Sequence, residues 1–264
     1  MELEERTVGA DVSETAGRGG PVHVLPLLLI GALASAAGIA LGAAIDWFPI
    51  QASGQAKDID TLWDVLVFTS VPVFVLVATI VLYTAYKWRV RPGEEGLDGP
   101  PIHGNTRLEI IWTAIPAVLL VTLVGYAYVV LTDVEEAQAN QMTVRVVGEQ
   151  FAWTYYYGTP RGAREEIKST QLYLPVGRQV QFKVQSKDVI HDFWVPAFRM
   201  KIDAVPGEET RFLVDTTRTG DYPVVCAELC GLGHSVMRST VHVLERGKFD
   251  QWLAKQAQEA REAQ

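Results

Sequence analysis

The sequence predicts an α+β membrane protein in which N-terminal transmembrane helices are followed by a β-sandwich. The first observation is that 48% of the 264 residues are hydrophobic and that they gather into long runs toward the N-terminal end. A soluble enzyme of this length would not show such runs. The second observation is a C-terminal half of short alternating or β-rich segments between Gly, Pro and Asp turns, which is the pattern of a sandwich.

Residues 63–132 are expected to form a transmembrane helical hairpin. Segments 65–86 and 110–131 each offer about twenty mostly apolar residues, enough to cross a hydrocarbon core of roughly 30 Å. Tryptophans stand near the ends of these runs, and basic residues crowd the loop between them. Because loops rich in Lys and Arg stay on the cytoplasmic side, this loop should be cytoplasmic and everything after Thr132 should lie outside. The basic residues are Lys87, Arg89, Arg91 and Arg107.

Segment 22–45 is a further apolar stretch, rich in Ala and Gly, for which two interpretations compete. It contains an Ala-Ser-Ala-Ala sequence of the kind found at signal-peptide cleavage sites. Against a signal peptide, the residues before it carry several acidic side chains, whereas the start of a signal peptide is short and positively charged. We expect a third transmembrane helix here, preceded by a disordered acidic tail over residues 1–21.

Residues 133–247 are expected to form the extracytoplasmic β-sandwich from about seven short strands. Residues 248–264, with Phe249, Trp252 and Leu253, are expected to form a helix that packs on the domain or on a partner and ends in a polar tail. The expected strands cover residues 142–147, 151–157, 168–174, 179–185, 211–215, 222–225 and 238–244.

The segment 226–237 brings together side chains that bind soft metals. It holds both cysteines of the chain, Cys226 and Cys230, together with His234 and Met237, and His191 lies 35 positions before Cys226. Thiolate and thioether ligands select copper over hard cations, and imidazole suits copper as well. Two thiols four positions apart offer two bridging sulfur atoms, so a pair of copper ions fits this segment better than one.

Three other interpretations of the two cysteines remain open at this point. In an exported domain the commonest one is a disulfide. A helical zinc site is disfavoured by Pro223, Gly231 and Gly233, which indicate a loop, and zinc has no use for Met237. A mononuclear copper site with two His, one Cys and an axial Met could form, but it leaves Cys230 unexplained.

Three segments closely resemble subunit 2 of the haem-copper cytochrome c oxidases. They are His-Asp-Phe-Trp-Val-Pro at 191–196, Asp-Ala-Val-Pro-Gly at 203–207, and the cysteine segment 226–237 itself. The resemblance covers about residues 60–245. It implies a cupredoxin-like β-sandwich that carries a binuclear, mixed-valence copper centre, usually called CuA.

The resemblance also implies a ligand set. Both thiolates would bridge the two copper ions, each imidazole would bind one ion, and a thioether and a backbone carbonyl would be weak axial ligands. The side chain of Glu228 would in addition reach a magnesium or manganese ion at the interface with the catalytic subunit. The implied copper ligands are Cys226, Cys230, His191, His234, Met237 and the carbonyl oxygen of Glu228.

Glu109 opens the second hairpin helix in the sequence Leu-Glu-Ile-Ile-Trp-Thr. A carboxylate is favourable at a helix N-terminus near the water boundary, and that reason alone explains its presence. The segment also resembles the Glu-x-x-Trp-Thr helix start of the family, where the carboxylate lies at the mouth of a proton channel of the catalytic subunit. Glu109 is therefore a candidate for that role.

The formal net charge of −8 predicts attraction of a basic electron donor. By resemblance, Asp188 and Asp203 would contribute to docking of cytochrome c. The family commonly has Gln-Trp-x-Trp where electrons enter, whereas this chain has Gln-Phe-Ala-Trp at 150–153, which leaves the entry residue in doubt. The candidates are Phe151, Trp153, on the same strand face, and Tyr155, which with Phe151 could form an apolar contact surface.

The resemblance implies an electron-entry subunit of a terminal oxidase. Electrons from cytochrome c would pass through the copper pair to a haem in catalytic subunit 1, where oxygen reduction is coupled to proton pumping; this chain would carry no oxygen chemistry. Subunit 3 and membrane lipid are further expected partners, and nucleic acid is not. The expected location is the prokaryotic plasma membrane, with the copper domain outside. The alternative is a membrane-tethered copper carrier or chaperone with a cupredoxin domain.

Overall fold

The computed structural model describes residues 24–90, 103–158 and 166–262. The expected acidic tail at 1–21 and most of the hairpin loop lie outside these ranges. The chain divides into two compact units, each described by itself: helical segments within 24–44 and 66–121, and a unit that contains the β-sandwich, made of residues 45–65 and 122–262 and called the sandwich unit below. Helices α2 and α3 contribute to both.

Within the described ranges, three helices are long and apolar enough to cross a membrane. They are α1 (Val24–Ala44), α2 (Gly54–Lys87) and α3 (Thr106–Val134). Helix α1 is apolar all round, as a membrane span is, and the prediction of a third helix is confirmed. Gly38 lets α1 approach α2, because a Cβ atom at this position would lie 2.7 Å from Cγ1 of Val71.

The first turn of α3 is capped from both directions. The side-chain oxygen of Asn105 accepts a hydrogen bond from the Leu108 N–H (3.2 Å), and the carboxylate of Glu109 accepts one from the Asn105 N–H (3.0 Å). Both bonds satisfy backbone donors that a helix N-terminus leaves unpaired. Glu109 therefore has a structural task in this chain whatever its relation to proton transfer.

In the part of the chain that the structure describes, ten strands form two five-stranded sheets, ordered β3-β2-β1-β5-β8 and β4-β10-β9-β6-β7. Most neighbours are antiparallel, but β1 runs parallel to β5 and β10 runs parallel to β4. The predicted fold class, helices followed by a β-sandwich, is confirmed. The strands are β1 (Met142–Glu149), β2 (Ala152–Gly158), β3 (Glu166–Ser169), β4 (Leu172–Pro175), β5 (Gln179–Ser186), β6 (His191–Val195), β7 (Met200–Ala204), β8 (Thr210–Asp215), β9 (Gly220–Cys226) and β10 (Arg238–Leu244).

The predicted single strand at 168–174 is wrong. Its residues form β3 and β4, which lie in different sheets. The hydroxyl of Ser169 donates to the Gln171 carbonyl (2.7 Å) and accepts from the Gln171 N–H (3.1 Å), and this local turn lets the chain change sheets. Two further strands, β6 and β7, were not predicted, because Pro196 and the short helical turn after it hide the antiparallel pairing of the flanking segments.

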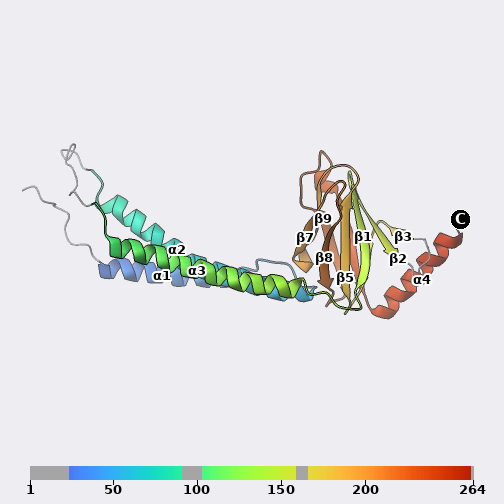
Figure 1. Cartoon of the computed structure of the whole chain (residues 1–264), viewed down its shortest axis with the longest axis horizontal. Coiled ribbons are helices and arrows are strands. Elements are labelled where there is room, and N and C mark those ends of the chain that lie inside the picture. Colours follow the sequence, from blue (N-terminus) through green and yellow to red (C-terminus); the bar gives the residue numbers. More distant parts are fainter. Residues whose placement is uncertain (1–23, 91–102, 159–165, 263–264) are drawn as a thin grey trace, which may run out of the picture. The chain divides into compact units, whose positions relative to one another are not determined.

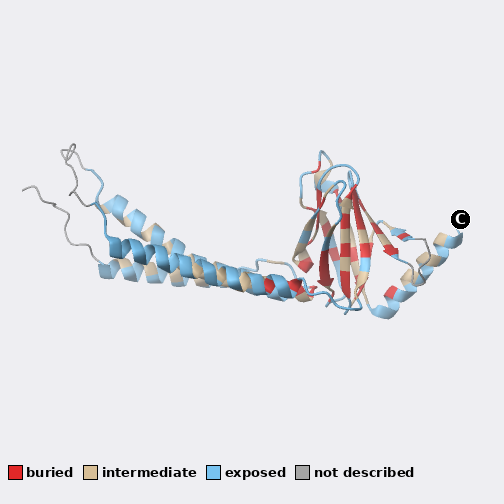
Figure 2. Cartoon of the chain, in the orientation of Figure 1, coloured by how far each residue is buried: buried red, intermediate tan, exposed pale blue. Residues whose placement is uncertain are grey.

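The core of the sandwich lies between the inner faces of the two sheets. Alternate residues of β2, Trp153, Tyr155 and Tyr157, point inward and are fully buried, as the red strand residues of Figure 2 illustrate. Helix α4 (Arg246–Glu262) covers one end of the core, since Phe249 is buried and Trp252 stacks on Tyr173 at 4.2 Å between ring centroids.

The connection from α1 to α2, with the first residues of α2, docks on the sandwich; residues 45–56 are called the junction segment below. The Ala52 N–H donates to the Ala197 carbonyl (2.9 Å), and the Ala52 carbonyl accepts from Thr217 (3.0 Å). The Ser53 hydroxyl accepts from the Ala56 N–H (3.1 Å), which caps α2, and donates to a carbonyl of the sandwich (2.9 Å). The junction segment is therefore held in a fixed register.

A buried ion pair completes this attachment. The guanidinium of Arg199 binds both carboxylate oxygens of Asp60 on α2 (2.7 and 3.0 Å) and donates to the carbonyls of Pro49 (2.6 Å) and Pro196 (2.9 Å). Its side chain is only 4% exposed and lies over the ring of Phe48. All of the guanidinium nitrogens thus have partners inside the sandwich unit.

Candidate metal centre

The metal-binding side chains predicted from the sequence meet at one rim of the sandwich. His191 is the first residue of β6 and Cys226 the last of β9, and these adjacent strands pair at Phe193 and Cys226. Residues 227–237, called the ligand loop below, connect β9 to β10 and carry Cys230, His234 and Met237. The loop is closed by a hydrogen bond from the Cys226 N–H to the Met237 carbonyl (3.2 Å).

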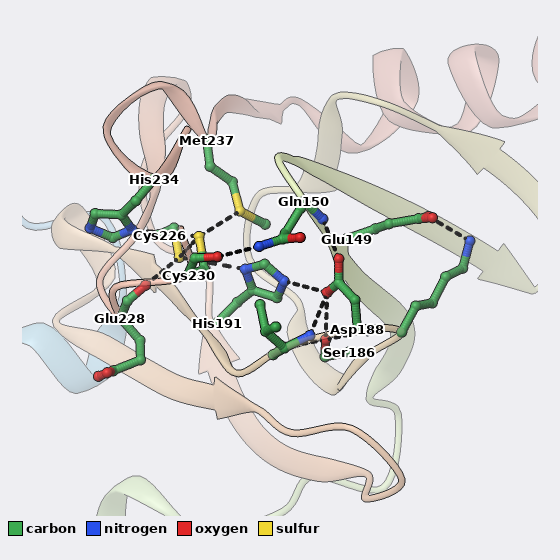
Figure 3. Close-up of polar contacts among 12 residues, drawn as sticks. Glu149, Gln150, Ser186, Asp188, His191, Cys226, Glu228, Cys230, His234 and Met237 are labelled. Carbon is green, nitrogen blue, oxygen red and sulfur yellow. Dashed lines mark hydrogen bonds and ion pairs between the residues drawn. The ribbon is translucent and has the colours of Figure 1, made fainter. Parts of the chain in front are cut away.

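The donor atoms converge on the two sulfur atoms. The Sγ atoms of Cys226 and Cys230 are 3.9 Å apart and both thiols are free, so no disulfide joins them. Nδ1 of His191 lies 3.9 Å from Sγ of Cys226, and Nδ1 of His234 lies 3.7 Å from Sγ of Cys230. Figure 3 shows the two imidazoles on opposite sides of the sulfur pair.

Two weaker donors complete the set. Sδ of Met237 lies 3.8 Å from Sγ of Cys230, and the carbonyl oxygen of Glu228 lies 3.2 Å from Sγ of Cys226. The sulfur atoms, one imidazole and the thioether are buried. Burial, followed by the neighbouring Cys226, raises the pKa of the Cys230 thiol to about 11. The Cys230 thiol would therefore lose its proton near neutral pH only if a bound cation stabilised the thiolate.

Asp188 fixes the orientation of His191. Its carboxylate lies 2.8 Å from Nε2 of His191 and accepts a hydrogen bond from the Gln150 N–H (2.7 Å). When Nε2 carries the ring proton and donates it to Asp188, Nδ1 presents its lone pair to the thiols. Partial burial alone would raise the pKa of Asp188, but the bonds from Gln150, His191 and Val189 outweigh it and lower the pKa to about 2.

Gln150 and Phe151 form a turn that contacts the ligand loop. The Gln150 amide donates to the Cys230 carbonyl, a contact drawn in Figure 3. The Phe151 ring lies against the loop backbone: a Cβ atom at Gly233 would come within 2.4 Å of Cδ2 of Phe151. This role of Gln150 was not predicted, although the residue stands beside Phe151 in the same motif and its side-chain amide is able to bond to a neighbouring loop.

The electron-entry candidates separate in the structure. Phe151 is 36% exposed at the rim. It precedes β2, so the prediction that it shares a strand face with Trp153 is wrong. Trp153 is buried and packs edge-on against His191 and Phe193. The prediction that Tyr155 helps form an exposed apolar contact surface is wrong, because Tyr155 is fully buried and its hydroxyl bonds to Ser239.

The carboxylates near the rim play different parts. Glu228 is exposed, and its carboxylate points away from the sulfur atoms in Figure 3. Asp203 is exposed on β7, directly opposite the buried Asp192 on β6. Lys201 binds Asp192 (2.6 Å), and this bond, with further attraction from Asp203 and Glu228, raises the pKa of the lysine.

The outer side of the ligand loop is apolar. Leu229, Leu232 and Val236 are 78%, 105% and 71% exposed, beside the half-exposed Phe151. Contiguous exposed apolar side chains mark surfaces that another molecule covers. This surface adjoins the donor atoms and was not predicted, because within a ligand motif the residues between ligands give no sign of which way they point.

A β-sandwich that gathers soft ligands at one rim and is attached to transmembrane helices defines a membrane-anchored cupredoxin-like protein. Comparison with known proteins specifies the family. The family "Cytochrome C oxidase subunit II, transmembrane domain" matches residues 40–130, and "Cytochrome C oxidase subunit II, periplasmic domain" matches residues 159–244. The chain belongs to the cytochrome c oxidase subunit II family.

Curated relatives named cytochrome c oxidase subunit 2 extend along most of the chain. The Synechocystis relative is 30% identical over 87% of this chain and 82% of its own length. The Thermostichus vulcanus relative is 33% identical over 77% of this chain and 76% of its own length. Among solved structures, the periplasmic domain of subunit II from Bradyrhizobium japonicum is 28% identical, covering 48% of this chain and 98% of that one with a TM-score of 0.42.

Membership of this family gives the chain its general role. It is the electron-entry subunit of cytochrome c oxidase, an oxidoreductase complex, and works with other oxidase subunits. It is a membrane protein with an extracellular domain, and the family implies that this domain binds copper. The cluster of His191, Cys226 and Cys230, whose ligand atoms lie within 4.8 Å of one another, fits that expectation.

Proposed function

We propose that the extracellular domain holds two copper ions bridged by the thiolates of Cys226 and Cys230. The observation that carries this proposal is the arrangement of one imidazole beside each sulfur atom, 3.9 Å and 3.7 Å away, on opposite sides of the pair. A single metal ion would draw both imidazoles to one side. Met237 and the carbonyl of Glu228 would serve as weak axial ligands.

The chemistry of the donor set favours copper over other metals. Zinc sites are built from four strong thiolate, imidazole or carboxylate ligands, and a buried thioether adds nothing to them. Thiolate with thioether favours copper, and a mononuclear copper site requires only one thiolate. Both thiols here are buried within the same cluster, and a second copper ion would give the second thiolate a ligand role that a mononuclear site lacks.

The surrounding residues hold the ligands in place. When bound, the copper pair accepts and releases single electrons. Asp188 orients His191, the Gln150 amide holds the Cys230 carbonyl, and the paired strands β6 and β9 fix the two ends of the site. Ligands that move little when the charge changes keep the reorganisation energy of electron transfer low, and the burial of the thiols excludes water.

The proposed electron donor is a cytochrome c. The rim combines an exposed apolar surface, formed by Leu229, Leu232 and Val236, with an exposed carboxylate at Asp203. A basic protein with an apolar patch around its redox group would fit this combination, because opposite charge speeds encounter and apolar contact gives the final fit. Asp188 contributes less than expected, since its carboxylate is engaged with His191 and two backbone N–H groups.

Further roles follow from the resemblance and remain proposals. The outward-pointing carboxylate of Glu228 is available for a magnesium or manganese ion shared with catalytic subunit 1, and subunit 3 is a further proposed partner. Glu109, at the start of α3, is proposed to lie at a proton-channel mouth of the catalytic subunit. We place the complex in a prokaryotic plasma membrane.

Copper analysis of the purified oxidase tests the central proposal. We expect two copper ions per chain and an electron paramagnetic resonance spectrum in which one unpaired electron is shared by both nuclei. Cys226→Ser and Cys230→Ser should each abolish that spectrum, whereas Ser235→Ala, in the same loop, should leave it unchanged. One copper per chain in the wild-type protein, with a spectrum that survives Cys230→Ser, would contradict the proposal and favour a mononuclear carrier.

The donor is tested separately by the rate of electron delivery to the oxidase. If a basic cytochrome c docks at the rim, the second-order rate should fall steeply as ionic strength rises, because salt screens the attraction. Neutralising Asp203 by Asp203→Asn should flatten this dependence. A rate that does not respond to salt would exclude electrostatic docking of this donor.

A further inference from the structure

A candidate binding site separate from the metal centre lies beside the junction segment, whose residues are far from the metal ligands in the sequence. An open depression of about 530 Å³ is lined by the junction segment, the outer turns of α2 and two arginines of the sandwich. Its size falls within the range of small-molecule sites. The lining residues that matter here are Asp46, Trp47, Ile50, Asp64, Arg199 and Arg218.

The charges in this cavity are of two kinds. The guanidinium of Arg199 already bonds to Asp60 and to backbone carbonyls, so Arg199 forms part of the cavity wall. Arg218 is exposed, and within the described part of the chain its guanidinium makes no ion pair. The carboxylates of Asp46 and Asp64 are likewise exposed without a side-chain partner among the described residues. One guanidinium and two carboxylates therefore line the same cavity, and none of the three makes an ion pair among the described residues.

The covalent chain places this cavity at the outer boundary of the membrane. The cavity residue Ile45 follows directly on Ala44, the last residue of the α1 span, and Asp64 directly precedes the apolar run that begins at Val65. Phe48 and Trp63 pack edge-on with ring centroids 5.5 Å apart, and Trp47 meets Trp63 at the same distance. Aromatic clusters of this kind occupy the headgroup level of a bilayer.

We propose that this cavity binds the headgroup of an ethanolamine phospholipid from the outer leaflet. The guanidinium of Arg218 would take the phosphate, since it can donate two hydrogen bonds to phosphate oxygens. Asp46 and Asp64 would take the primary ammonium, and Trp47 and Ile50 would contact the glycerol and upper acyl region. A purely anionic headgroup fits less well, because two carboxylates would face it without compensation.

Native mass spectrometry of the full-length chain tests this assignment. The chain would be delipidated in detergent and titrated with phosphatidylethanolamine and, separately, with phosphatidylglycerol. We expect one phosphatidylethanolamine per chain, bound about tenfold more weakly by Arg218→Gln, which is the effect of losing a charge-assisted hydrogen bond. The double variant Asp46→Asn with Asp64→Asn should reverse the preference toward phosphatidylglycerol. Arg261→Gln, an exposed arginine on α4, is the matched control and should bind as the wild type does.

Several results would overturn the proposal. They are equal binding by Arg218→Gln and Arg261→Gln, or a lipid preference that the double aspartate variant leaves unchanged. The test must also exclude a protein as the occupant of the cavity. A photo-crosslinker at position 64 of the intact oxidase should react with lipid. Reaction with a neighbouring subunit would show that protein fills the cavity. Unchanged thermal unfolding of each variant separates lost binding from lost folding. None of these readouts depends on copper.

Discussion

The ligand loop and the junction segment are both irregular stretches attached to the same sandwich, yet they are held in opposite ways. In the junction segment, backbone and side-chain groups bond to the sandwich itself, and the buried Arg199 is fully paired with Asp60 and carbonyl oxygens. Between the ligand loop and the adjoining ends of β6 and β9, sulfur and imidazole donors face one another across 3.7 to 3.9 Å, while apolar side chains of the loop point to solvent.

This difference separates a segment that serves stability from one that serves chemistry. Groups that satisfy one another inside the fold contribute to the free energy of unfolding, and their loss is costly. Donor atoms that contact only one another are available to bind a metal ion, and exposed apolar side chains are available for contact with a partner protein. Substitutions in the two segments should therefore produce different phenotypes, and the predictions below test that contrast.

The largest stability effect is expected from Asp60→Ala. It leaves the buried guanidinium of Arg199 without its carboxylate, and an unpaired buried charge costs about 3 kcal/mol. We expect chemical denaturation of the full chain in detergent to show this loss, with the copper spectrum of the folded protein unchanged. Asp58→Ala, at an exposed position on the same helix, should have little effect.

A double-variant cycle sharpens this test. When Arg199→Met is combined with Asp60→Ala, no charge is left unpaired, and much of the lost stability should return. If Asp60→Ala costs no more than Asp58→Ala, the junction segment is not held by this ion pair. If instead Asp60→Ala alters the copper spectrum, the proposed separation between the two segments fails.

Gly233→Ala should have the next largest effect, and it acts on the ligand loop. The added Cβ would come within 2.4 Å of the Phe151 ring, so the ring or the loop must move. Overpacking of this kind costs about 2 kcal/mol. We expect lower thermal stability together with a perturbed copper spectrum, because the loop backbone at Gly233 directly precedes His234.

The cause can be verified by removing the ring. Phe151→Ala combined with Gly233→Ala should restore the copper spectrum, since the new methyl group would then have space. Gly247→Ala is the matched control, because no atom lies within 4 Å of a Cβ at that position. A spectrum that stays perturbed in the double variant would mean that Gly233 is required for its backbone and not for its contact with Phe151.

Asp188→Asn should lower stability by about 1 kcal/mol in a pH-dependent way. The pKa of Asp188 is lowered from 3.8 to about 2 in the folded chain, so its carboxylate stabilises the fold fully above about pH 4. That contribution is lost as the pH falls through 2. Denaturation of the copper-free chain between pH 5 and pH 2 should therefore show a steeper loss in the wild type than in the variant.

The copper spectrum gives this prediction a second readout. An asparagine amide can still accept a hydrogen bond from His191, but without the negative charge that strengthens it. We expect a small spectral shift with both copper ions retained. Identical pH profiles for the wild type and Asp188→Asn would show that Asp188 does not titrate as its contacts require.

The ligand set could be predicted from the sequence because its chemistry is local. Cys226, Cys230, His234 and Met237 lie within twelve consecutive residues, and their chemical types alone point to a soft metal. The transmembrane helices could be predicted equally well, because a run of about twenty apolar residues has few structures open to it other than a membrane span. The contribution of His191 depended on family resemblance, because nothing in its own segment shows that β6 pairs with β9.

The remaining contacts depend on long-range pairing that no local pattern encodes. The bond between Arg199 and Asp60 joins residues 139 positions apart, and the contact of Gln150 with Cys230 spans 80. The burial of Tyr155 was misjudged for a related reason. Alternation along β2 gives two faces, and only the second sheet decides which of them is covered.

The smallest effect on stability is expected from Leu232→Ser. Its side chain is fully exposed, so replacement should change the free energy of unfolding by less than about 0.5 kcal/mol. The same change removes apolar area from the outer surface of the ligand loop, and binding of the partner that covers this surface should weaken. The measurement is the Michaelis constant for cytochrome c in the assembled oxidase, together with the yield of assembly.

A raised Michaelis constant with normal assembly would place Leu232 at the donor contact, whereas reduced assembly would place it against another oxidase subunit. If neither quantity changes, the exposed apolar side chains of the ligand loop serve no partner, and the contrast with the junction segment would rest on the metal ligands alone.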